Sequence, residues 1–150
     1  IYRDTLDEEV GYLINAAKVN FVYAEDQEQV DKILTIKKPK TNKINIYYED
    51  SRGLKELEDP HITDMLDLIN EGQDIASKNP DKYSKMIDKV SGDQEAILCT
   101  TSGTTSDPKL AMLPGGKFIE HVIRYLKVDP KNIDDEYVSV LPFPWIMEQT

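Results

Sequence analysis

The chain has 150 residues, of which 39% are hydrophobic and 31% charged, so it can bury a core as one domain or part of a larger one. Its formal net charge of −10 argues against nucleic-acid binding and against docking on anionic membranes. No apolar run approaches the ~20 residues that span a bilayer, and a single cysteine, Cys99, excludes an internal disulfide, so we expect a soluble, cytoplasmic protein.

A helix is predicted close to the start of the chain. Thr5 and Glu8 have the spacing of a capping box, in which two side chains satisfy free backbone N–H groups at a helix start. Acidic residues around Glu8 favour the positive end of the helix. Apolar side chains then recur at helical spacing, at Leu6, Val10, Leu13, Ile14 and Ala17.

A β-strand, a helix and a second strand are predicted next. Residues 19–24 are β-branched and aromatic, which indicates a short buried strand. Asp26 can cap the following helix, and residues 44–48 alternate between apolar and other side chains, as in a strand. Two strands joined by a helix in about thirty residues form a βαβ unit, whose strands should be parallel in one sheet.

The rest of the chain continues the alternation. We expect a helix after Pro60, followed by a loosely helical polar segment over residues 72–92. A strand is predicted over residues 96–99, and an apolar stretch follows at 110–113. A helix over residues 118–126 and a strand over 137–141 complete the chain's predicted elements. Alternating strands and helices predict an α/β fold with βαβ units and a largely parallel sheet. His61 has no evident partner, and Cys99 is expected to be buried and inert.

Residues 101–109 form a loop rich in small and hydroxyl-bearing side chains. Small residues allow backbone N–H groups to turn inward around an anion, and Gly103 allows close approach of the backbone. Pro108 stiffens the chain before Lys109, which adds a positive charge at the rim. A strand leads into the loop, which predicts a position at the sheet edge where α/β folds bind ligands. Further donors are Thr101, Ser102, Thr104 and Thr105.

The loop differs from a Walker P-loop because no glycine precedes Lys109. It resembles the T-S-G-T-T-G-x-P-K-G signature of the adenylate-forming superfamily, which includes acyl-CoA synthetases, luciferases and peptide-synthetase adenylation domains. Ser106 and Leu110 stand where that family usually has glycine, and Pro114 follows where a His or polar residue is usual.

Two further segments resemble long-chain fatty acyl-CoA synthetases within that superfamily. Residues 140–149 are similar to the family's L-P-x-x-[HW]-x-x-E segment, with Trp145 at the aromatic position. Residues 21–34 are similar to its V-x-E-[DN]-x-x-Q-x-x-K region, and residues 1–13 to the start of its large domain. The resemblance covers nearly the whole chain. Among its segments, only the loop signature is specific enough to indicate the superfamily by itself.

The resemblance implies a site and its substrates. Thr101, Ser102, Gly103, Thr104, Thr105 and Lys109 would bind ATP phosphates together with Mg²⁺, and Trp145 would lie near the acyl tunnel, although core packing is an equal expectation for it. Partners would be ATP, coenzyme A and a fatty acid or other carboxylic acid. No residue of the chain is assigned as catalytic or as a metal ligand. A Ser/Thr-rich surface turn is the alternative for the loop.

The family's adenine, ribose and C-terminal segments have no counterpart in residues 1–150. We therefore expect a partial large N-terminal domain that is cut at both ends, with the C-terminal domain supplied by the longer parent protein. If that parent protein associates with a membrane, we expect the association to be peripheral. Ser106 predicts weakened nucleotide affinity if its position needs a positive φ angle. Two other functions stay open: a ligase for another carboxylic acid, or a non-catalytic nucleotide-binding remnant.

Overall fold

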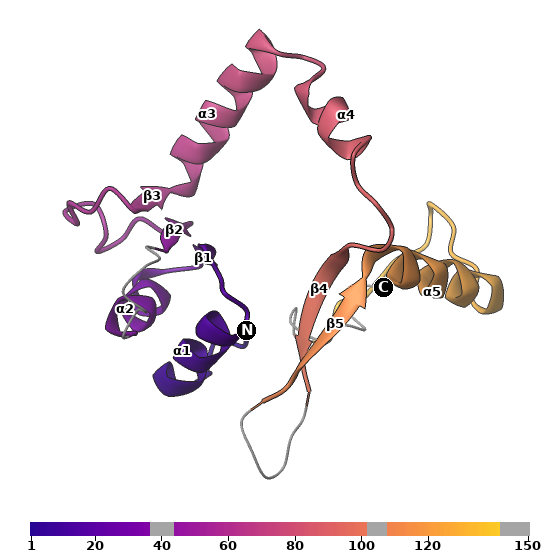
Figure 1. Cartoon of the computed structure of the whole chain (residues 1–150), viewed down its shortest axis with the longest axis horizontal. Coiled ribbons are helices and arrows are strands. Elements are labelled where there is room, and N and C mark those ends of the chain that lie inside the picture. The colour runs from indigo at the N-terminus through magenta and orange to yellow at the C-terminus, as the bar shows by residue number, and fades with distance from the viewer. Residues whose placement is uncertain (37–43, 102–107, 142–150) are drawn as a thin grey trace. The chain divides into compact units, whose positions relative to one another are not determined.

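A computed structural model describes residues 1–36, 44–101 and 108–141 (Figure 1). The chain divides into two compact units, which contain Arg3–Met86 and Ile87–Thr150. Each unit has its own small sheet, so each is described separately. Among the described residues, no helix combines the length and apolar character needed to cross a membrane.

The first unit is built on three parallel strands. β1 (Phe21–Ala24), β2 (Asn45–Tyr48) and β3 (Ile62–Asp64) lie in that order, with Val22 opposite Ile46 and Ile46 opposite Ile62. Helix α2 (Gln27–Thr35) connects β1 to β2, and the Asp26 side chain accepts a hydrogen bond from the Gln29 N–H at 3.2 Å. The predicted βαβ unit and its Asp26 cap are confirmed.

Helix α1 (Asp7–Ala16) begins later than predicted. Leu6, in an extended conformation, is the residue at the N-cap, and no side chain makes a capping hydrogen bond there. The predicted capping box of Thr5 and Glu8 is therefore wrong, because Thr5 precedes the N-cap by one residue. The acidic first turn remains, with Asp7, Glu8 and Glu9 at the positive end of the helix.

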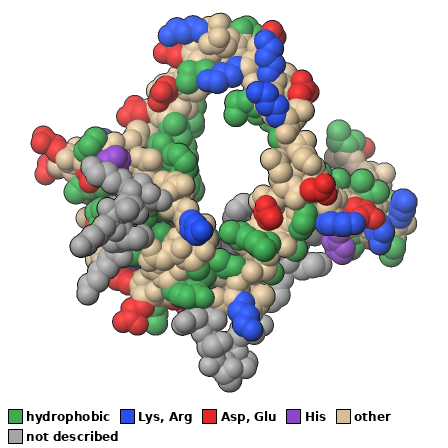
Figure 2. All heavy atoms as spheres, in the orientation of Figure 1, with side chains coloured by type: hydrophobic (Ala, Val, Ile, Leu, Met, Phe, Trp, Pro, Cys, Tyr) green, Lys and Arg blue, Asp and Glu red, His purple; other side chains and the backbone are tan. Residues whose placement is uncertain are grey.

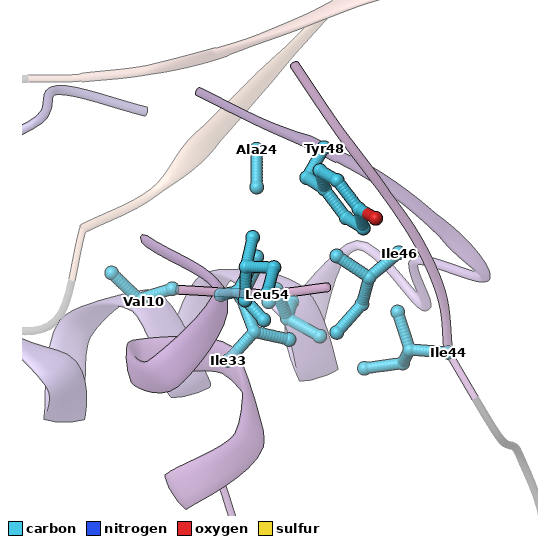
Figure 3. Close-up of a cluster of buried hydrophobic side chains, with 9 residues drawn as sticks. Val10, Ala24, Ile33, Ile44, Ile46, Tyr48 and Leu54 are labelled. Atoms are coloured by element: carbon cyan, nitrogen blue, oxygen red, sulfur yellow. The ribbon is translucent and has the colours of Figure 1, made fainter. Parts of the chain in front are cut away.

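The core of the first unit lies between its sheet and its first two helices (Figure 3). One set of alternating strand residues, including Ala24, Ile46 and Tyr48, is buried, whereas Phe21 and Tyr23 on the alternate positions are largely exposed. The strand that was predicted to be buried, β1, thus has one buried face, and the side chains on its other face are largely exposed. The core side chains are Val10, Ile14, Ala24, Val30, Ile33, Ile44, Ile46, Tyr48 and Leu54.

The segment before the second unit is helical. Asp64 ends β3 and caps helix α3 (Met65–Lys78) by accepting a hydrogen bond from the Leu66 N–H at 2.9 Å. A short helix, α4 (Lys82–Ile87), follows, and neither α3 nor α4 has a buried residue. The predicted loosely helical segment is confirmed, but the predicted helix after Pro60 starts only at Met65, because β3 takes the residues before it. His61, predicted to lack a partner, has its Nδ1 3.0 Å from Asn45 Oδ1.

The second unit holds a hairpin and a helix. β4 (Glu95–Thr100) and β5 (Leu110–Pro114) are antiparallel, and helix α5 (Gly115–Val128) follows directly. Cys99, expected to be buried, is only partly so. The predicted strand over residues 137–141 is wrong: these residues have no strand conformation, and Val138 and Val140 are exposed.

A tight ion pair shapes the loop after β2. Arg52 Nε lies 2.7 Å from Asp50 Oδ2, and the Arg52 backbone N–H donates to Asp50 Oδ1 at 3.0 Å. These bonds to Arg52 lower the pKa of the Asp50 carboxyl to about 2. The next residue, Gly53, has φ +76°, a backbone conformation that strains any residue with a Cβ and therefore favours glycine.

Replacing Arg52 with glutamine is expected to raise the pKa of Asp50 toward the ordinary value near 4. Because the folded-state pKa is depressed, the interaction stabilises the loop above about pH 4 and is lost as the pH falls toward 2. A carboxyl-carbon NMR titration measures this pKa directly. Lys55→Gln, a charge removal in the same loop, should leave it unchanged; an unchanged Asp50 pKa in the Arg52 variant would contradict the assignment.

Candidate nucleotide-binding site

The hydroxyl-rich loop connects the two strands of the β4–β5 hairpin (Figure 1). Thr100 lies opposite Leu110, and Cys99 lies opposite Ala111. One residue further, the Thr101 N–H donates to the Lys109 carbonyl oxygen at 2.9 Å, and Thr101 Oγ1 lies 3.4 Å from the same oxygen. Thr101 and Lys109 therefore face each other across the neck of the loop.

Two of the predicted phosphate-binding residues are thus brought together, and both are exposed. The 3.4 Å separation is too long for a strong O–H···O hydrogen bond, so the Thr101 hydroxyl keeps most of its capacity to donate to a ligand. The Lys109 main chain is fixed while its ammonium group stays accessible. The remaining predicted binding residues, Ser102, Gly103, Thr104, Thr105 and Trp145, lie outside the described residues.

The sequence predicts the loop at a sheet edge, in a fold whose sheet is largely parallel. In the structure the loop reverses the chain between two antiparallel strands. The reason is its length, because only nine residues separate Thr100 from Leu110 and a parallel crossover needs a dozen or more.

Leu110 replaces the signature's last glycine without an evident steric conflict. It is the first residue of β5, pairs with Thr100 and is half-buried. A leucine in regular strand conformation needs no special backbone angle. The hairpin therefore accommodates leucine at this signature position without backbone strain.

Two glycines that sequence reasoning did not single out hold the other end of the hairpin. The Gly115 N–H donates to the Gln94 carbonyl at 2.9 Å, and the Gly116 N–H donates to the Gly92 carbonyl at 2.8 Å. These are the first two N–H groups of α5, which have no partner inside the helix. A Cβ on Gly116 would lie only 3.0 Å from the Gly92 oxygen. The consecutive glycines at the helix start were the signal for this close backbone contact.

A metal site does not emerge from the described residues. No group of three or more His, Cys, Asp or Glu side chains in residues 1–36, 44–101 and 108–141 could hold a metal ion. Mg²⁺ is bound mainly by oxygen ligands, including carboxylates and substrate phosphates. We therefore assign no protein ligand for the Mg²⁺ that the resemblance implies.

The parallel βαβ unit agrees with the α/β fold that the sequence predicts, and residues 101–109 carry the signature described above. The chain belongs to the AMP-binding enzyme family, whose profile matches residues 1–150. It is similar to long-chain-fatty-acid–CoA ligase ACSBG1 of Rattus norvegicus, with 30% identity over 99% of this chain and 20% of that protein. Long chain acyl-CoA synthetase 8 of Arabidopsis thaliana is 26% identical over the same shares of both chains.

A shorter but closer similarity exists to long-chain-fatty-acid–CoA ligase 6 of Mus musculus, which is 41% identical over 38% of this chain and 9% of that protein. The chain spans about a fifth of the length of the first two relatives. No solved structure matches the chain. These comparisons bear out the resemblance on which the sequence prediction rested.

Proposed function

We propose that this chain is the phosphate-binding part of an acyl-adenylate-forming ligase that activates a long-chain fatty acid for transfer to coenzyme A. The observation that carries the proposal is the placement of the family signature. Thr101, at its start, and Lys109, near its end, are held opposite each other by a backbone hydrogen bond. The AMP-binding enzyme profile matches the residues both before and after the signature. The hydrogen bond fixes the neck of a loop whose residues are suited to a polyphosphate.

The first half-reaction forms the acyl-adenylate. A carboxylate oxygen attacks the α-phosphorus of ATP, and the bond from that phosphorus to the bridging oxygen breaks, so pyrophosphate leaves with the electron pair. Negative charge grows on the leaving group, and preorganised N–H, hydroxyl and ammonium donors stabilise it. In this chain Lys109 and the Thr101 hydroxyl, both exposed at the neck, are the described groups suited to that task.

The second half-reaction transfers the acyl group. The thiolate of coenzyme A attacks the acyl carbon, and the bond from that carbon to the AMP phosphate oxygen breaks, which releases AMP and the thioester. No described residue is assigned a role in this step. The local donors must also offset the chain's net charge of −10, which repels a nucleotide at long range.

The acid is proposed to be a long-chain fatty acid because several relatives, including the rat, Arabidopsis and mouse proteins, are named for that substrate. Trp145 is proposed to contact the acyl chain, on the resemblance of its segment alone. The location proposed for the protein is the cytoplasm.

The test is ATP–pyrophosphate exchange by the complete protein that contains this chain. We expect exchange that depends on a long-chain fatty acid such as palmitate and that is weak with acetate, benzoate or amino acids. Exchange restricted to short, aromatic or amino acids would contradict the fatty-acyl assignment while retaining the adenylating one. An absence of exchange with every acid would contradict both.

A second function is favoured by one observation, the serine at position 106 in place of the signature's glycine. A loop that binds ATP weakly without turnover would make the protein a non-catalytic nucleotide-binding remnant. Equilibrium binding of ATP without any acid-dependent exchange would support that function. Restoring exchange by Ser106→Gly would then locate the defect in this loop.

A further inference from the structure

Strand β4 has a free edge in the part of the chain that the structure describes, where β5 is its one strand partner. Residues directly opposite each other in an antiparallel pair alternate between hydrogen-bonded and non-bonded pairs. The bond from the Thr101 N–H to the Lys109 carbonyl marks a bonded pair, so the same register makes Leu98 and Met112 a non-bonded pair. The backbone N–H and C=O groups of Leu98 and Thr100 therefore point away from β5, toward the free edge.

This edge lacks the features that usually protect an edge strand, such as lysine, proline or a bulge. Residues 96–100 carry no charge, no proline and no glycine. By contrast, β5 follows Lys109 and ends at Pro114. The ladder shifts its register between Glu95 and Ile97, at the start of β4, and is regular from there to the end of the strand. The free edge is therefore suited to the addition of another strand.

The hairpin beside this edge is poorly covered. Leu98 is 44% exposed and Met112, opposite it, is 65% exposed. Hydrophobic side chains accordingly lie at the surface over β4 and β5 in Figure 2. Across β4, β5 and α5, all of which the structure describes, no residue is buried. Two strands are marginally stable in water, and a third strand or more is needed for a stable sheet.

We propose that the free edge of β4 pairs with the β4 edge of a second copy of the chain, in the antiparallel direction. Charge favours this occupant and this direction. Asp93 and Glu95 lie at the start of β4, whereas Thr100 at its end is uncharged. Parallel pairing would place the acidic residues of both copies side by side, which is unfavourable, and antiparallel pairing separates them to opposite ends of the interface. The edge is thus complementary to itself.

The outward backbone groups define the register of this pairing. A two-fold axis at Leu98 brings the Leu98 residues of both copies opposite each other, where each N–H donates to the other copy's carbonyl. The two hairpins then form one four-stranded sheet. The proposal uses residues of the second unit alone and does not depend on the proposed function.

Sedimentation velocity of the full chain over a range of concentrations tests the association. We expect an equilibrium between monomer and dimer. Leu98→Lys puts two like charges opposite each other at the two-fold axis and should weaken the dimer about tenfold. The matched control, Met112→Lys, adds the same charge on the strand away from the interface and should associate as the original chain does. Far-UV circular dichroism verifies that each variant keeps its fold.

Cysteine cross-linking tests the register. The Cα atoms of opposite residues in a bonded antiparallel pair are about 5.5 Å apart, which a disulfide can span. In a Cys99→Ser background, Leu98→Cys should therefore give a covalent dimer on oxidation. Met112→Cys in the same background should remain monomeric under those conditions.

Four results would overturn the proposal. The first three are a monomer at every concentration, association that continues beyond a dimer, and an equal loss of dimer in the two lysine variants. The fourth is protection of the Leu98 and Thr100 amides from hydrogen exchange in a complete protein that is monomeric. That result would assign the edge of β4 to another strand of the same protein.

Discussion

Replacing Gly116 with alanine is expected to destabilise the β4–β5 hairpin by about 2 kcal/mol, the range of an overpacked contact. The new Cβ would lie 3.0 Å from the Gly92 oxygen and 3.1 Å from the Gly92 Cα. Both are backbone atoms, so they can move only if the hydrogen bond from the Gly116 N–H to the Gly92 carbonyl lengthens. Hydrogen exchange measures the effect, and amides of β5 and early α5 should exchange about thirtyfold faster.

Gly72→Ala is the matched control because it makes the same chemical change inside helix α3. No atom lies within 4 Å of a Cβ at that position, so alanine should stabilise the helix by about 0.5–1 kcal/mol through its higher helix propensity. Amides of β1 and β2, in the other unit, should exchange at unchanged rates in the Gly116 variant. Equal exchange of β5 in the Gly116 variant and the original chain would show that the close backbone contact is not maintained in solution.

Local patterns were sufficient to predict part of the first unit. The βαβ arrangement around α2 depends on hydrophobic periodicity and on the Asp26 cap, and both act within a few residues. The start of α1 was predicted wrongly because the spacing of Thr5 and Glu8 suits a capping box without requiring one. β3 was missed because three residues, Ile62–Asp64, are too few to show alternation. Its pairing with β2 is a tertiary interaction that sequence periodicity does not report.

The second unit was predicted less well because its structure depends on pairing. The strand before the loop was predicted, whereas residues 110–113 were predicted only as an apolar stretch. The antiparallel direction of β4 and β5 follows from the short connection between Thr100 and Leu110 rather than from either strand's residues. Residues 137–141 have the alternation of a strand and are not one. The contact between Gly92 and Gly116 joins residues far apart in the sequence, and neither glycine lies in a signature position.

The site was predicted from its chemistry more than from its geometry. Thr101 and Lys109 were named for a hydroxyl and a charge, and the structure adds that they face each other across the loop neck. The hydrogen bond between them uses backbone atoms, so it fixes their positions whatever their side chains are. A side-chain substitution at Lys109 can therefore separate the contribution of charge from that of loop shape.

Replacing Lys109 with alanine in the complete protein is expected to lower kcat/KM for ATP about a hundredfold in ATP–pyrophosphate exchange, the usual loss when one preorganised donor to developing charge is removed. The value of kcat should fall as well, because the charge on the leaving pyrophosphate is larger in the transition state than in bound ATP. A fall confined to KM would mean that the ammonium group binds both states equally.

Two measurements separate this loss of charge from a damaged hairpin. Hydrogen exchange of the Thr101 amide reports the neck directly, because that N–H donates to the Lys109 carbonyl at 2.9 Å, and its protection should survive the substitution. Lys55→Ala removes another exposed charge, outside residues 101–109, and should leave exchange activity unchanged. Full activity in the Lys109 variant, with the Thr101 amide still protected, would show that Lys109 does not act in the phosphate site. If the Lys109 variant loses both its activity and the protection of the Thr101 amide, the role of Lys109 is structural. Only a loss of activity with a protected Thr101 amide assigns the ammonium group to the leaving pyrophosphate.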